Sequence, residues 1–170
     1  FKRVKTVYDQ RETLSLTAEQ QTLLEKTYKS FTRNGANLSL NDKESLRKID
    51  KELATLKLKF SENVLAETQH YQWVITDKKQ LRGLPDFVLE MLAQEAQKRH
   101  TQGWVITLDM PVYTAVMKYA DNRDLRQKLF TDYHSRCAGE SAFSNEANVL
   151  RIAELRQARA TLLGYPSYAA

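Results

Sequence analysis

The chain has 170 residues, of which 42% are hydrophobic and 28% are charged, with only five glycines and three prolines. This composition excludes collagen, disordered and low-complexity proteins, and the length fits one domain or part of one. The single cysteine, Cys137, excludes an internal disulfide, and no apolar stretch approaches the ~18 residues of a membrane span. The net charge of +5 is spread along the chain, so we expect a solvated surface and no nucleic-acid binding.

Two long helices are predicted in the first part of the chain. Thr17 and Gln20 have the spacing of a capping box, and Gly35 is typical of a helix end. Asn41 and Glu44 repeat the start signal. An apolar stripe at helical spacing then comprises Leu46, Ile49, Leu53, Leu56, Phe60 and Val64. We expect these two helices to form an antiparallel pair with the stripe in a core, and a coiled-coil contact is the alternative.

The pattern changes from helical to β-type near the middle of the chain. Residues 70–76 and 104–108 are rich in β-branched and aromatic side chains, which predicts two short strands whose pairing stays open. Between them, Pro85 lies in the first turn of a predicted helix. The expected buried face of that helix consists of Phe87, Val88, Met91 and Leu92.

Three further helices are predicted after the second strand. Pro111 opens the first of them, residues 121–124 start the second, and Asn145 caps a third that ends at Gly164. The second has Leu125, Leu129, Phe130 and Tyr133 on one face. The sequence therefore predicts a mainly α fold, a helical array with two short β-strands, as one segment over residues 1–170. Pro166 is placed to begin a new helix, so we expect a piece of a longer protein.

The sequence offers few residues for catalysis or metal binding. His70, His100 and His134 include no pair at the four-residue spacing of a zinc-binding helix. His134 and Cys137 are three residues apart and would suit a metal site or a nucleophile with its base. A partly buried thiol beside a surface histidine is the other interpretation, and it is the one we adopt.

Acidic residues give no stronger candidate. Asp121 and Asp124 flank a predicted helix start, where carboxylates accept hydrogen bonds from free backbone N–H groups. They would also suit a cation, but the neighbouring Arg123 and Arg126 favour ion pairs. We therefore assign no catalytic, cofactor-binding or metal residue within residues 1–170.

Six short motifs occur in an order that resembles the thimet oligopeptidase family of zinc metallopeptidases. They lie at residues 60–65, 75–77, 81–85, 106–113, 116–123 and 155–165. The resemblance covers nearly the whole chain, and within the family the motifs are most similar to those of the oligopeptidase A branch. It implies a mostly helical protein with a deep channel that admits short peptides, and one zinc ion held by a His-Glu-x-x-His helix and a further glutamate.

None of those zinc-binding residues occurs in this sequence. The resemblance therefore implies a non-catalytic segment, N-terminal to the zinc-binding region, that forms channel wall and scaffold. The parent enzyme would hydrolyse short peptides in the cytoplasm, and this segment would pack against the missing catalytic portion without zinc or a membrane contact of its own. The alternative is an autonomous helical protein-interaction module without enzymatic activity.

The two tryptophan-containing strands suggest one further hypothesis. If either strand lies at a sheet edge that faces the channel, the backbone of a peptide can add to it as another strand. The runs around Trp73 and Trp104 motivate this hypothesis.

Overall fold

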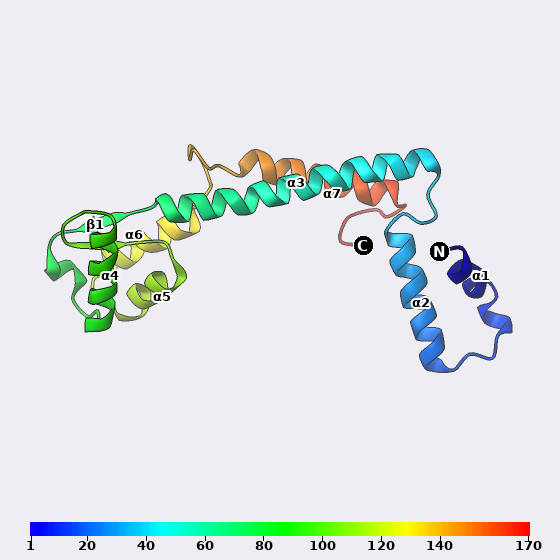
Figure 1. Cartoon of the computed structure of the whole chain (residues 1–170), viewed down its shortest axis with the longest axis horizontal. Helices are drawn as coiled ribbons and strands as arrows, with labels where there is room; N and C mark the ends of the chain where they lie inside the picture. The colour runs from blue at the N-terminus through cyan, green and yellow to red at the C-terminus, as the bar shows by residue number, and fades with distance from the viewer. The chain divides into compact units, whose positions relative to one another are not determined.

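The computed structural model describes all residues from Phe1 to Ala170, and its fold is mainly α-helical. It contains seven α-helices, two short 3₁₀ helices and a two-stranded antiparallel sheet, so the predicted fold class is confirmed (Figure 1). The chain forms two compact units. We call residues 1–56 with 150–170 the terminal unit, and residues 57–149 the middle unit. No helix is both long enough and apolar enough to cross a membrane.

The terminal unit begins with α1 (Lys2–Asp9), a 3₁₀ turn (Arg11–Thr13) and α2 (Ala18–Arg33). The predicted capping box is present, because the Thr17 side chain accepts from the Gln20 N–H and the Gln20 side chain accepts from the Thr17 N–H. The prediction that α2 pairs with α3 was wrong, because α2 has a different partner. It packs against α1, where the rings of Tyr8 and Tyr28 stack with centroids 3.7 Å apart, and does not form an antiparallel pair with α3.

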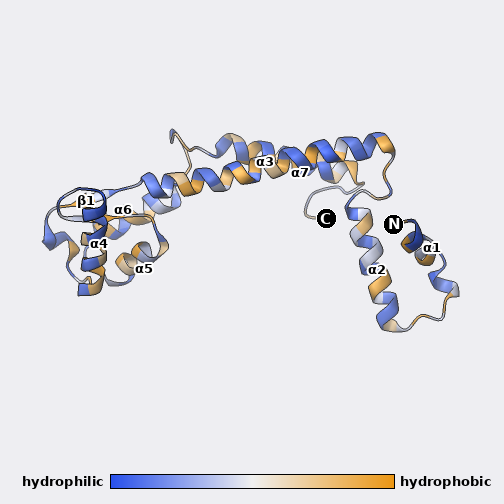
Figure 2. Ribbon diagram, in the orientation of Figure 1, coloured by the Kyte–Doolittle hydropathy of each residue, from blue (hydrophilic) through white to orange (hydrophobic).

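Helix α3 (Leu40–His70) begins earlier than predicted. Its first turn is capped by Ser39, whose Oγ accepts from the N–H of Asp42, and Asn41 is already helical. Figure 2 shows apolar and polar residues interleaved along α3, as its stripe requires. Within the terminal unit, Leu46 and Leu53 from this stripe are buried.

The part of α7 (Glu146–Leu162) that belongs to the terminal unit is joined to α3 by ion pairs. Arg151 donates to both carboxylate oxygens of Glu52, with Nε–Oε1 and Nη2–Oε2 distances of 2.7 and 3.2 Å. Arg159 Nε donates to Asp50 Oδ1 over 2.8 Å. Gly164 follows the last turn as predicted, but no helix begins at Pro166.

The middle unit holds the sheet and its covering helices. Strand β1 (Trp73–Ile75) pairs antiparallel with β2 (Trp104–Ile106), and Val74 lies opposite Val105. A 3₁₀ helix (Lys78–Leu81) and α4 (Asp86–Lys98) separate the strands, and α5 (Met110–Tyr119) and α6 (Arg123–His134) follow β2. The core of this unit joins both strands to all three helices and includes Ile75, Ile106, Val88, Leu92, Val116 and Leu129.

Several local predictions for the middle unit need correction. Both strands are shorter than predicted, because His70 belongs to α3 and residues 107–108 lie beyond β2. Pro85 is the N-cap of α4 and does not lie in its first turn. Phe87, predicted to be buried, is 62% exposed, and Phe130 is 48% exposed although Leu125 and Leu129, predicted on the same face, are buried. The buried residues of α4 are Val88, Leu92 and Ala96, spaced by four.

Candidate functional site

The residues that most resembled a reactive pair do not act together. His134 is the last residue of α6, and its Nδ1 donates to the carbonyl of Phe130 one turn earlier, over 2.9 Å. Cys137 lies beyond that helix in the left-handed backbone region, with φ of 59°, and its side chain is buried. Its N–H donates to Glu67 Oε2 over 2.5 Å, which ties this turn to α3. Both residues are thus used in local structure.

The electrostatics of Cys137 also oppose a nucleophilic role. Burial and the neighbouring Glu67 carboxylate raise the pKa of the thiol from 9.0 to about 11. A cysteine nucleophile needs the opposite shift, because the thiolate is the reactive form. This thiol stays protonated at neutral pH, and the other interpretation of the pair, a thiol removed from solvent beside a surface histidine, agrees with the structure.

The raised thiol pKa predicts how stability depends on pH. The unfolded chain releases the Cys137 proton near the usual pKa of 9.0, and the folded chain releases it near 11, so protonation favours the folded state. This contribution is complete below pH 9.0 and is lost as the pH rises toward 11. We expect wild type to lose more unfolding free energy than Cys137→Ser between these limits, as measured by urea denaturation. Parallel losses in the two proteins would contradict this assignment.

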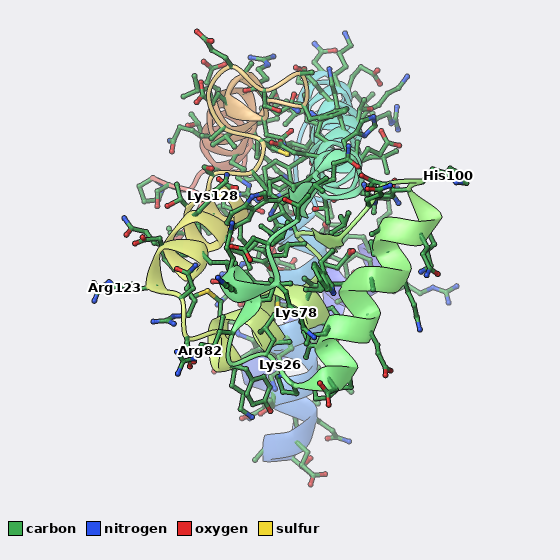
Figure 3. The ribbon with its side chains drawn as sticks, turned by 90° about the vertical axis from the view of Figure 1, so that its left-hand side faces the viewer. Lys26, Lys78, Arg82, His100, Arg123 and Lys128 are labelled. Carbon is green, nitrogen blue, oxygen red and sulfur yellow. The ribbon has the colours of Figure 1, made fainter.

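The other two histidines are also held apart. His70 Nδ1 donates to the carbonyl of Ala66 over 2.9 Å, and its ring lies 5.0 Å from that of Phe143. His100 follows α4 with φ of 54°, and Figure 3 shows its side chain pointing away from the ribbon. Nowhere in the chain do three or more His, Cys, Asp or Glu side chains form a group that could hold a metal ion.

Asp121 and Asp124 are explained by the start of α6. Asp121 Oδ2 lies 3.2 Å from Arg82 Nε, and the Asp121 N–H donates to the Arg82 carbonyl over 2.9 Å. Figure 3 labels Arg82 and, at the first position of α6, Arg123. The cap itself is Asn122, whose Oδ1 accepts from the N–H groups of Asp124 and Leu125. These carboxylates form an ion pair and a helix start, and not a cation site.

The terminal unit has a surface hollow of about 530 Å³. It is open to solvent and lies between the turn after α2 and the first turns of α3. Its lining includes Gly35, Lys43, Leu46, Arg47 and Asp50. Arg47 is paired with Glu44 over 2.7 Å, and the lining contains no histidine or cysteine. The hollow therefore offers no thiol nucleophile or histidine base, and its basic side chains are solvated.

Sequence reasoning missed the polar contacts that fix the segment between α6 and α7. Glu67 accepts from Ser141 Oγ over 3.0 Å in addition to the Cys137 N–H. Asn145 was predicted to cap α7, but its side chain donates to the carbonyl of Phe60 over 3.1 Å and accepts from Asn63 over 2.9 Å. The sequence contains one signal for these contacts, which is the presence of polar residues on the side of α3 that is half-buried in the structure.

Comparison with known proteins gives the relationship that the geometry alone does not. The chain is 39% identical over 99% of its length to "Probable cytosolic oligopeptidase A" of Arabidopsis thaliana. It is 32% identical to "Dipeptidyl carboxypeptidase" and 27% identical to "Oligopeptidase A", both of Escherichia coli, again over nearly the whole chain. These relatives are members of the thimet oligopeptidase family, to which the chain is similar over nearly its whole length. No protein-family model matches it.

The extent of these matches defines what the chain represents within the family. It spans 25% of the length of each of these three relatives. The matched region includes both the terminal and the middle unit, because the alignments cover 99% or more of the chain. The chain therefore corresponds to about a quarter of the length of these thimet oligopeptidase family proteins.

Proposed function

We propose that this chain is a non-catalytic segment of a zinc metallopeptidase that hydrolyses short peptides. The observation that carries this proposal is the alignment of 99% of the chain with oligopeptidase A proteins, of which it spans only a quarter. The local use of His134, Cys137, Asp121 and His70 in helix ends, turns and an ion pair supports a structural role.

Zinc is implied by the family, and the residues of this chain do not fit it. A catalytic zinc site needs three protein ligands that converge on one point, and no such group exists here. We propose that the metal of the parent enzyme is bound by a His-Glu-x-x-His helix and a further glutamate outside this chain. When bound there, zinc would polarise the scissile carbonyl and activate water.

We further propose that this segment forms channel wall and scaffold by packing against the catalytic portion. In the middle unit, Leu58 and Leu65 of α3 are 61% and 57% exposed, and they lie seven residues apart on one helix face. Val149 at the end of this unit is 50% exposed. Burial of such side chains is favourable by roughly 25 cal/mol per Å² of apolar surface, which makes them suited to contact with the rest of the parent. We place the parent in the cytoplasm, as the name of the first relative suggests.

Zinc content and peptide cleavage test the proposal directly. The complete gene product should contain one zinc ion per chain by elemental analysis and cleave short fluorogenic peptides, with loss of cleavage after chelation. The 170-residue chain alone should show neither zinc nor cleavage above background. Stoichiometric zinc with peptide turnover by the pure chain would overturn the non-catalytic assignment. A complete gene product without a His-Glu-x-x-His motif would overturn the peptidase assignment and favour the interaction module.

A further inference from the structure

The outer edge of β1 carries backbone groups that the chain does not use. Gly103 precedes β2 with φ of 92°, and a Cβ on Gly103 would overlap the carbonyl oxygen of Ile75, so that carbonyl points toward β2. In an antiparallel pair, successive residues of a strand direct their N–H and C=O groups to opposite sides. The N–H and C=O of Val74 therefore point away from β2.

No hydrogen bond outside the sheet uses these two groups. No backbone hydrogen bond outside the sheet involves residues 72–76. The side chain of Val74 is 38% exposed, in contrast to its partner Val105, which is fully buried on the strand that α4 packs against. A strand edge with free N–H and C=O groups is a template for another strand. This edge is available and β2 is the protected strand.

We propose that the outer edge of β1 binds a short peptide in extended conformation, which adds to the sheet as a third strand. This assignment rests on the proposed function, because peptides are the substrates expected of the parent. Main-chain pairing recognises the peptide backbone and not a particular side chain, so it would accept short peptides of different sequence. Lys78 and Lys79 follow β1, are exposed and form no ion pair within the chain, so they complement a peptide carboxylate.

The two tryptophans make the binding measurable on the chain itself. Trp73 and Trp104 are the only tryptophans, and they lie in the two strands of this sheet. We expect an unstructured peptide of about ten residues to change their fluorescence in a saturable way. The amide hydrogen of Val74 should exchange more slowly in the presence of the peptide. The same peptide with N-methyl groups at alternate residues has lost the donors needed for strand pairing, and it should not bind.

Two variants separate backbone pairing from side-chain docking. Val74→Pro removes the outward N–H but none that bonds to β2, and edge strands tolerate proline. It should weaken peptide binding at least about fivefold, which corresponds to the loss of one hydrogen bond. Val74→Thr keeps both the N–H and the β-branched shape, so it should bind as wild type does. Circular dichroism shows whether the proline variant folds, and the N-methylated peptide gives the same comparison without any change to the protein.

Specific outcomes would overturn the assignment. The first is that the unmodified peptide changes neither the tryptophan fluorescence nor the exchange of the Val74 amide hydrogen. The second is that the N-methylated peptide binds as tightly as the unmodified one. The third is that a folded Val74→Pro variant binds the peptide as tightly as wild type. Dimerisation of the chain through this edge, seen as a concentration-dependent mass that Val74→Pro abolishes, would assign the edge to a second copy instead. Peptide hydrolysis by the complete gene product tests the proposed function separately. If the complete gene product hydrolyses peptides but no peptide binds at the β1 edge, only this inference is rejected.

Discussion

Replacing Leu92 with alanine is expected to lower the free energy of unfolding of the middle unit by about 2–5 kcal/mol. Leu92 lies in the centre of α4, has no exposed surface and packs in the core that joins the sheet to the helices. The substitution removes buried apolar surface and leaves a cavity that the surrounding helices fill only partly. Urea denaturation followed by tryptophan fluorescence measures this loss, because Trp73 and Trp104 both belong to the middle unit.

A matched control is available on the same helix. Phe87→Ala removes a larger side chain that is 62% exposed, and it should change the free energy of unfolding by no more than about 0.5 kcal/mol. The sequence alone places both residues on one buried face, so the pair distinguishes the structure from the prediction. Comparable losses for the two substitutions would show that the face of α4 is wrongly assigned.

Local signals in the sequence were sufficient for much of the fold. The Thr17 capping box, the stripe positions Leu46 and Leu53 and the two tryptophan strands all depend on residues that are near one another in the chain. These features follow from backbone geometry and helical or β periodicity, which a sequence displays directly. Helix faces were predicted less well, because adjacent residues lie about 100° apart around a helix, so Phe87 is exposed although its neighbour Val88 is buried.

The polar contacts between distant residues were not predictable in this way. Cys137 and Glu67 are 70 positions apart, and Asn145 and Asn63 are 82 positions apart, so no local pattern connects them. Their pairing depends on how the loop after α6 returns to α3, which is a tertiary event. The same reason explains why Asn145, although correctly placed before α7, was given a capping role that its side chain does not have.

Asn145→Ala is therefore expected to destabilise the middle unit strongly, by about 2–3 kcal/mol. Asn145 is only 3% exposed and its amide makes three hydrogen bonds. Its Oδ1 accepts from Asn63 and Asn148, and its Nδ2 donates to the carbonyl of Phe60. Alanine removes the acceptor of the buried Asn148 amide and of the half-buried Asn63 amide, which costs more than the net value of the bonds themselves. Tryptophan-detected urea denaturation gives the loss.

A double-mutant cycle with Asn63→Ala shows whether the network acts as a unit. Asn63 Nδ2 donates to Asn145 Oδ1 over 2.9 Å. Each single substitution therefore leaves the other amide of the pair without this hydrogen bond. The double variant should lose less stability than the sum of the two single losses, with a coupling energy of about 0.5–3 kcal/mol. Gln69→Ala removes an exposed amide from the same helix and should be close to neutral. Additive losses would mean that the amides are satisfied by water after substitution, and that packing alone attaches this loop to α3.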